Sequence, residues 1–429
     1  MSTHLRQLSS DERFYLYFLS HVPELGAVSI RNVFEAYPSP EVLVRACAGQ
    51  RKDVGMRADA SLQADTVRRT DAGRDIHQLS LTADPLFADL SVHSDPDTAP
   101  DCEAPPPASS LLTGKQIDGV RLAWDNLAGM KEKYDEMQSR DIRFITYYDA
   151  EYPSRLRNIH ASPMVLYVIG ELPSDDAPAV AIVGSRKCTN YGSSMTRYFA
   201  RELAEKGVNV ISGMAYGVDT WAHVGALDVP SGRTFAVLGC GVNICYPKEN
   251  FDIYTTMAYC GRGGVISETI PGLNPLKKHF PMRNRIISGL SDAVLVMEAR
   301  EKSGSLITAD LALEQGRDVM ALPGRVTDPL SRGCNALIDT GARILKSPDD
   351  VMELLGLMRT GTYELPVRDI SSLTDEEKII YRSIDTSPHY VQDIADDTKL
   401  PPGRIMSILL DLELKGYVTQ VSANYYSAV

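Results

Sequence analysis

The stretch that most constrains the fold is an apolar run that ends in a glycine and a cation. Residues 180–186 read Val-Ala-Ile-Val-Gly-Ser-Arg, which predicts a buried strand that breaks at Gly184. The next apolar-periodic segment, from about Met195 to Lys206, predicts a helix. A strand, a glycine turn and a helix form the opening unit of a doubly wound α/β domain, in which ligands bind at the carboxyl ends of the strands. We therefore expect Arg186 to point into a ligand site.

The same layout recurs down to about residue 324. Each expected strand is a continuous apolar run, as a parallel sheet covered on both faces requires. The fold class is therefore predicted to be α/β, with a Rossmann-like doubly wound, mostly parallel sheet in a domain spanning 139–350. Strands are expected at 142–146, 165–168, 208–211, 235–238, 264–267, 293–297 and 318–322, and helices at 219–226, 250–259, 283–290 and 306–315.

The N-terminal region, 1–138, is predicted to be an all-helical domain of a SAM or helix-hairpin-helix-like kind. Helical patterns cover 10–47 and 112–138, and between them an Asp-, Ala-, Ser- and Pro-rich segment, 48–110, predicts a disordered acidic insertion. A DNA-backbone-binding hairpin would need a second glycine after Gly26, where Val28 or Ser29 stands. A small helical packing module is the other interpretation.

The C-terminal region is predicted to be a winged helix at 372–429, joined by a helix and linker at 351–371. Residues 374–377 form a capping box that opens its first helix, and Gly416 ends its third before two short strands. From residue 372 onward there are five Lys and Arg against nine Asp and Glu. A duplex reader must neutralise phosphates, so this module is expected to mediate protein contact or to regulate a dimer.

Composition indicates a soluble, cytoplasmic protein. The 429 residues contain no run of 18 apolar residues, and the N-terminus lacks a signal-peptide pattern. Seven cysteines occur without CxxC pairs, which fits a reducing compartment and small buried side chains. The net charge is −12, but residues 180–346 hold 19 Lys and Arg against 15 Asp and Glu. This distribution favours one anionic ligand held at one place.

Small residues and cations gather where the predicted strands end. Backbone amides at helix N-termini and closely approachable glycines suit phosphate, although any one such turn can also be purely structural. The small-residue sites are 184–186, 212–213, 239–241, 267–268 and 303–305. Residues 277–285 add four cations, an amide and Phe280, which are suited to phosphates and to stacking on a base. The alternative is a solvated charge run with a buried ring.

Several functions lack their sequence signatures. No GxGxxG follows the first strand, no Walker A lysine is present, and no nucleophile accompanies a base. Asp219 and His223 are four residues apart and could be metal ligands, but a helix-cap carboxylate and a packing histidine are the simpler interpretation. We therefore expect no cofactor, no metal and no enzymatic activity.

The motifs closely resemble the DNA-processing protein A family (DprA, also called Smf) between about Tyr148 and Ala342. The insertion at 48–110 has no counterpart in this resemblance. The motifs that carry it are Gly184-Ser185-Arg186, Tyr191-Gly192, Ser212 to Asp219, Ala222-His223, Tyr246-Pro247, Ser267-Glu268, Phe280 to Arg285, Ser303 to Ala309 and Leu322-Pro323-Gly324.

The resemblance implies a sequence-independent single-stranded-DNA-binding protein without catalytic activity. Members of the family protect incoming strands in natural transformation, load the recombinase RecA for homologous recombination, and form homodimers through the Rossmann-like domain. By motif, Arg186 corresponds to the phosphate-binding arginine, Lys277 to a DNA-contacting lysine and Phe280 to the residue that meets a base. The full set of expected DNA-binding residues is Gly184, Ser185, Arg186, Ser212, Gly213, Lys277, Phe280, Arg283, Asn284, Arg285, Ser303, Gly304 and Ser305.

Two other functions remain open at this point. The same Rossmann variant resembles the lysine-decarboxylase-like nucleotide phosphoribohydrolases, but their Pro-Gly-Gly-x-Gly-Thr run is absent, and only Glu268 and Glu298 stand as candidate catalytic carboxylates. A transcription regulator acting through the winged helix is weakened by the acidity of that module.

Overall fold

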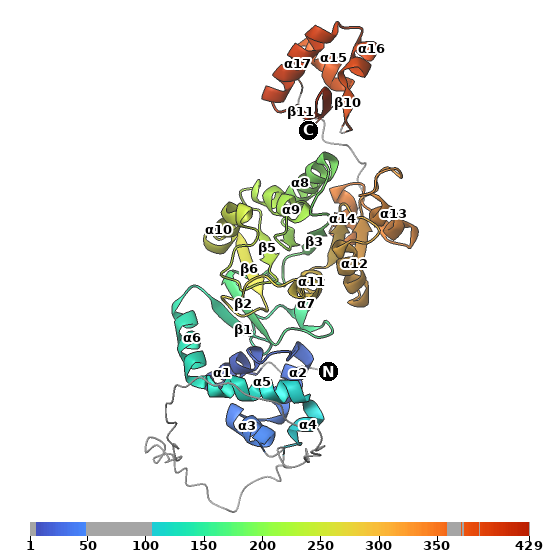
Figure 1. The fold of residues 1–429 in the computed structure, drawn as a ribbon. Helices are drawn as coiled ribbons and strands as arrows, with labels where there is room; N and C mark the ends of the chain where they lie inside the picture. Colours follow the sequence, from blue (N-terminus) through green and yellow to red (C-terminus); the bar gives the residue numbers. More distant parts are fainter. Residues whose placement is uncertain (1–5, 49–104, 358–369, 371–372, 386, 429) are drawn as a thin grey trace, which may run out of the picture.

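The computed structural model describes residues 6–48, 105–357, 370, 373–385 and 387–428. Helices from the N-terminal region lie at one end of the molecule, an α/β domain lies in the middle, and a small C-terminal module lies at the other end (Figure 1). The predicted fold class is confirmed. Most of the predicted insertion lies outside the described residues; its last part is described, and a helix, α4, begins there at Ala108.

The central domain is built on a nine-stranded sheet in the order β1-β2-β6-β5-β4-β3-β7-β8-β9. All neighbours from β6 to β9 are parallel, whereas β1 pairs antiparallel with β2, and β2 with β6. The strands are β1 Arg143–Thr146, β2 Val165–Gly170, β3 Ala179–Val183, β4 Asn209–Ser212, β5 Thr234–Val237, β6 Gly263–Ser267, β7 Ala293–Val296, β8 Asp318–Ala321 and β9 Arg343–Ile344.

Helices cover both faces of this sheet, as its apolar strands predict. In β3, Val180 and Ile182 pack with one layer, formed mainly by α8, α9 and α14, whereas Ala181 and Val183 face the layer that contains α10, α11 and α12. The helices are α7 Ser154–Arg157, α8 Asn190–Glu205, α9 Val218–Leu227, α10 Phe251–Tyr259, α11 His279–Gly289, α12 Gly304–Glu314, α13 Arg332–Asp339 and α14 Pro348–Leu354.

The largest differences from the predicted helix starts occur at α8 and α11, which both begin earlier than the hydrophobic pattern predicts. Helix α8 starts at Asn190 because the Thr189 hydroxyl caps it, accepting a hydrogen bond from the Gly192 amide at 3.1 Å. Helix α11 starts at His279, so that Phe280 lies on the helix and not in the preceding loop. Helices α7 and α13 and strand β9 were not predicted; β9 has only two residues, both exposed.

The N-terminal helices form one continuous core with the antiparallel edge of the sheet. The Ser20 hydroxyl lies 3.0 Å from the Tyr167 hydroxyl of β2, and the ring centroids of Tyr17 and Phe144 are 5.9 Å apart. These helices are α1 Ser10–Ser20, α2 Ala27–Ala36, α3 Pro40–Ala48, α4 Ala108–Leu111, α5 Gly114–Asp125 and α6 Leu127–Ser139.

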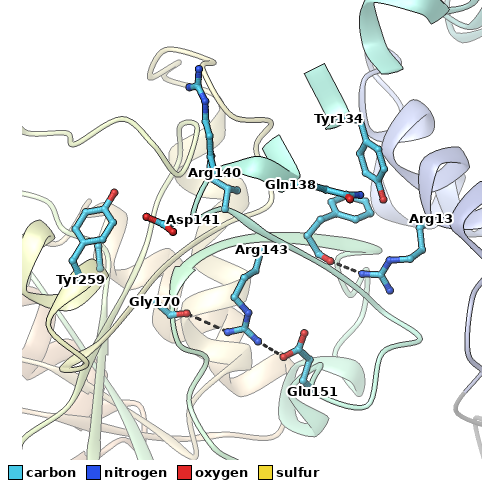
Figure 2. Close-up of a pocket in the computed structure, with 12 residues that line it drawn as sticks. Arg13, Tyr134, Gln138, Arg140, Asp141, Arg143, Glu151, Gly170 and Tyr259 are labelled. Atoms are coloured by element: carbon cyan, nitrogen blue, oxygen red, sulfur yellow. Dashed lines mark hydrogen bonds and ion pairs between the residues drawn. The ribbon is translucent and has the colours of Figure 1, made fainter. Parts of the chain in front are cut away.

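Arginines complete this junction (Figure 2). Arg13 of α1 donates to the Phe144 carbonyl and to the Asp149 carboxylate, both at 2.6 Å. Arg143 of β1 donates to the Gly170 carbonyl at 3.1 Å and pairs with Glu151. The helical region is therefore joined to the sheet by polar contacts as well as by apolar packing.

The C-terminal module has the predicted winged-helix arrangement of three helices and two wing strands. A short third strand, β10, was not predicted, and the sheet has the order β10-β12-β11. Its separate core includes Ile380, Ile394, Ile408 and Leu412. The elements are α15 Asp375–Arg382, β10 His389–Tyr390, α16 Val391–Thr398, α17 Pro402–Leu414, β11 Val418–Ser422 and β12 Tyr425–Ala428. Within the described part of the chain, no helix has both the length and the apolar character needed to cross a membrane.

One buried histidine makes the stability of the central domain pH-dependent. His223 of α9 is fully buried, with Nδ1 2.7 Å from the Thr234 hydroxyl of β5, and burial lowers its pKa to about 3. Below the ordinary histidine pKa of 6.5, the unfolded chain takes up a proton that the folded chain excludes. The contribution of neutral His223 to the free energy of unfolding is therefore complete above pH 6.5. It falls by about 1.4 kcal/mol per pH unit as the pH falls toward 3.

We expect the free energy of unfolding of the native chain to fall by about 2 kcal/mol more than that of His223→Gln between pH 6.5 and 5. Urea unfolding followed by Trp221 fluorescence, in a Trp124→Phe background, measures this difference. His160→Gln, at an exposed histidine, is the matched control and should keep the native pH dependence. Equal slopes for the native chain and His223→Gln would contradict a buried neutral imidazole.

Candidate nucleic-acid interface

A cavity of about 590 Å³ opens where the strand order of the sheet reverses. The reversal lies between β3 and β7, and the loops that follow these two strands diverge there, as at ligand sites of other doubly wound folds. Residues 184–186 follow β3, residues 300–305 follow β7, and α11 supplies a third wall. The structure thus has a cavity at the edge of the sheet where the sequence predicted a ligand site.

Arg186 and Phe280 form the centre of this cavity. The Arg186 guanidinium lies over the Phe280 ring, 5.3 Å from its centroid, and the centroid of the Tyr246 ring lies 5.9 Å from that of Phe280. Arg186, Tyr246 and nearby Lys277 are exposed, whereas Phe280 is half-buried. The arrangement offers a partly fixed aromatic ring between cations, which suits a base and its phosphate.

The N-terminus of α12 provides a second anion-binding element. Ser303 caps the helix, and its hydroxyl lies 2.8 Å from the Ser305 hydroxyl and accepts a hydrogen bond from the Ser305 amide at 3.4 Å. The first turn of the helix borders the cavity, where it adds the positive end of the helix dipole. Exposed Arg300 and Lys302 immediately precede this cap.

Arg283 lies below the cavity with only 7% of its surface exposed. One of its terminal nitrogens donates to the carbonyls of Gly213, at 2.8 Å, and Val237, and its Nε donates to the Asn284 side chain at 3.0 Å. The other terminal nitrogen is 3.9 Å from buried Asp219. Its donors are therefore directed into the protein, toward the ends of β4 and β5.

Burial sets the protonation tendencies of this pair. It raises the pKa of Asp219, although nearby Arg283 and the Ala215 amide act in the opposite direction. It also lowers the pKa of Arg283, which the Asp219 carboxylate in turn raises. The buried pair lies at the floor of the site.

Ten of the thirteen expected DNA-binding residues line the cavity, and three do not. Ser212 is buried and donates to the Ile182 carbonyl at 2.7 Å, and Gly213 contributes its carbonyl to Arg283. Arg285 points to the opposite side of α11, where it donates to both carboxylate oxygens of Glu268 at 2.8 Å. The ten that line it are Gly184, Ser185, Arg186, Lys277, Phe280, Arg283, Asn284, Ser303, Gly304 and Ser305.

Three prominent cavity residues were not among those expected from the sequence, namely Tyr246, Arg300 and Lys302. The positions of Arg300 and Lys302, just before the small-residue turn at 303–305, could have indicated them. Tyr246 is on a loop after β5; its Tyr246-Pro247 motif entered the family resemblance, but no binding role was assigned to it. With these residues the cavity wall holds five cations and one carboxylate, that of Asp219.

The two carboxylates considered for catalysis are engaged elsewhere. Glu268 is held by Arg285, and Glu298 is buried, accepting a hydrogen bond from the Thr189 amide at 2.8 Å. Burial also raises the pKa of Glu298. Neither residue lines the cavity. Across the described ranges, no three His, Cys, Asp or Glu residues are grouped so that they could hold a metal ion.

A second hollow, of about 770 Å³, lies at the junction of the N-terminal helices and the sheet (Figure 2). It is lined by Arg13, Arg140 and Arg143, but these cations pair with Asp149, Glu136 and Glu151. The charge available to an anion is therefore much smaller here than at the β3–β7 cavity.

Comparison with known proteins identifies the family. The family model for DNA recombination-mediator protein A matches residues 143–356, and the model for the DprA winged helix domain matches residues 364–424. Protein Smf of Synechocystis is 36% identical over 321 residues, which are 67% of this chain and 80% of that protein. The chain belongs to the DprA/Smf family.

Other DprA proteins agree with this assignment. DNA processing protein DprA of Streptococcus pneumoniae is 45% identical over 202 residues, which are 47% of this chain and 70% of that protein. The X-ray structure of DprA from the same organism has a TM-score of 0.50 and 37% identity, covering 57% of this chain and 83% of the other. The function of this chain therefore lies in DNA processing.

The contact between Gly213 and Arg283 generates a stability prediction. A Cβ atom at Gly213 would lie 2.1 Å from the Arg283 guanidinium, which must then leave the two carbonyls that it holds. We expect Gly213→Ala to lower the free energy of unfolding by about 1–3 kcal/mol, the usual range for overpacking. Chemical denaturation of the purified native chain and of the variant measures this difference in the free energy of unfolding.

Gly304→Ala is the matched control in the same domain, because a Cβ there has no neighbour within 4 Å. We expect its stability to stay within about 0.5 kcal/mol of the native value. Native stability in Gly213→Ala would show that Arg283 does not need its place against this backbone.

Proposed function

We propose that this chain binds single-stranded DNA at the β3–β7 cavity, without sequence preference and without catalysing a reaction. The observation that carries the proposal is the Arg186 guanidinium seated over the Phe280 ring, beside Lys277 and the capped N-terminus of α12. Phosphates would bind the cations and helix amides, and a base would stack on the ring.

The geometry favours a single strand over a duplex. Phe280 is half-buried within the cavity, so a base reaches its face only when that base is not paired in a duplex. Stacking tolerates all four bases because each has a π-face, and the cations contact a backbone common to every sequence. Both features support recognition without sequence preference.

We assign Arg283 and Arg285 to positioning and not to direct contact with DNA. The guanidinium of Arg283 is held by two carbonyls and Asn284, and that of Arg285 by Glu268. Arg186, Lys277, Arg300 and Lys302 are exposed at the cavity and remain the candidates for phosphate contact.

The phosphoribohydrolase alternative finds little support at this site. Its chemistry needs a carboxylate beside the bound nucleotide, but Asp219 is the one acid in the described cavity wall and is buried against Arg283. Release of a free base from nucleoside monophosphates by the purified chain would revive the alternative.

We further propose that the chain protects incoming single strands in natural transformation and loads RecA on them during homologous recombination, acting as a homodimer through its Rossmann-like domain. The family description as a recombination mediator and the cationic cavity support this role. Formation of RecA filaments on single strands coated with single-strand-binding protein tests the loading. Sedimentation at increasing protein concentration tests the dimer.

The decisive test of the site is fluorescence anisotropy with a labelled oligo-dT and a matched duplex across a salt series. We expect the native chain to prefer the single strand. Arg186→Ala should lower affinity at least tenfold and reduce the slope of log K against log salt by about 0.7, because one phosphate contact is lost. Phe280→Leu should lower affinity about five- to a hundredfold, the value of one stacked base, and leave the slope unchanged.

Arg201→Ala serves as the matched control, because this arginine is exposed on α8, pairs with Glu205 and lies outside the cavity wall. It should bind like the native chain. The proposal fails if the Arg186 and Phe280 variants both bind oligo-dT with native affinity.

A further inference from the structure

The outer face of α17, the third helix of the winged-helix module, is apolar where a duplex-reading helix would be cationic. Met406, Leu410 and Leu414 are spaced four residues apart and therefore share one side of the helix. Their exposed fractions are 38%, 54% and 79%. The opposite side of the helix, with Ile405, Ile408, Leu409 and Leu412, fills the core of the module. The helix is therefore apolar on both sides.

This apolar stripe, defined as Met406, Leu410 and Leu414, has acidic edges. Asp411 is exposed beside Leu410, and Glu413 lies next to Leu414, where it accepts a hydrogen bond from the Gln420 amide at 2.9 Å. Neither takes part in an ion pair among residues 373–385 and 387–428. The ion pairs found there join Lys378 to Asp375, His389 to Asp385, Arg404 to Glu376 and Lys415 to Glu377, and a further one joins Arg325 to Asp385.

The cations on and just after α17 are engaged in ion pairs within the module. Arg404 donates to Glu376 of α15 at 2.6 Å, and Lys415, just after the helix, donates to Glu377 at 2.7 Å. A helix that enters the major groove needs such groups free for phosphates and base edges. The stripe is therefore unsuited to nucleic acid.

Within the described residues, the stripe takes no part in the polar contacts that join this module to the central domain. Among the described residues, contacts between this module and the central domain come from its strand side, where Ser427 lies 3.4 Å from Asn190 and Asp385 lies 3.7 Å from Arg325. Figure 1 shows the three helices of the module farther from the central sheet than β11. Binding at the stripe would therefore leave the DNA-binding cavity accessible.

We propose that the stripe is a docking site for an amphipathic helix of a partner protein that is apolar on one face and carries Lys or Arg along its edges. Helix-on-helix packing would bury Leu410 and Leu414, and the partner's cations would meet Asp411 and Glu413. Charge selects this occupant over a second copy of the chain, because two copies of the stripe would place acidic edges against acidic edges. The proposal does not depend on the single-stranded-DNA site.

The test uses the full chain and two labelled helical peptides with the same leucine spacing, one with lysines at its polar positions and one with glutamates. Anisotropy should show binding of the lysine peptide and not of the glutamate peptide. A Leu410→Gln, Leu414→Gln double variant should weaken binding of the lysine peptide at least tenfold. Its affinity for oligo-dT should stay native, which shows that the chain is still folded.

Charge reversal gives a second, independent readout. Asp411→Lys combined with Glu413→Gln, which keeps the acceptor for Gln420, should weaken the lysine peptide and allow the glutamate peptide to bind. Leu122→Gln, at a leucine of α5 with 66% exposure, is the matched control and should bind the lysine peptide like the native chain.

Three results would overturn the proposal. Binding of the lysine peptide that does not change in the leucine double variant would place the peptide elsewhere. A smaller sedimentation coefficient in that variant would identify the occupant as a second copy of the chain. A loss of duplex-DNA binding in that variant would identify the stripe as a nucleic-acid surface.

Discussion

The site depends on one buried guanidinium, that of Arg283. Removing such a group from water costs several kcal/mol unless its donors find acceptors, and here the carbonyls of Gly213 and Val237 accept two hydrogen bonds, with Asp219 close by. A lysine could not replace it, because the planar fork reaches acceptors on two strand ends and on α11 itself. The side chain thus ties α11 to the sheet and places Phe280, one turn earlier, over the cavity.

Much of this architecture could be predicted because short stretches of the sequence indicate its strands and turns. Continuous apolar runs identify β3 to β8, and the small residues that follow them mark the ligand-binding edge. The start of α11 could not be predicted, since the Lys277–Pro281 segment has no apolar period. Nor could local sequence show that Lys277 is exposed at the cavity whereas Arg283 and Arg285 are held by other protein groups, because all three occur in the same cationic run. The three side chains point in different directions because of acceptors that are distant in sequence. These are the carbonyls at the ends of β4 and β5, which hold Arg283, and the Glu268 carboxylate after β6, which holds Arg285.

The uneven distribution of charge favours the cavity over the rest of the surface as a binding place for a polyanion. The chain carries a net charge of −12, yet the cavity wall holds five cations and one acid. Acidic surfaces elsewhere, including the winged-helix module, repel a polyanion and so oppose nonspecific adhesion. Under the proposed function, a nucleic-acid strand would be directed to the β3–β7 cavity, where exposed cations can neutralise phosphate. The same acidity makes the winged-helix module suited to a cationic protein partner and not to a polyanion.

The strand order has a consequence for biosynthesis. β3 pairs with β4, which follows it closely, and with β7, which lies on the order of a hundred residues further along the chain. The cavity draws its walls from loops after both β3 and β7, so a nascent chain still lacking β7 has a partial sheet and no complete site. Ligand capture is therefore a property of the finished domain. A chain that still lacks β7 therefore cannot hold a polyanion in this cavity.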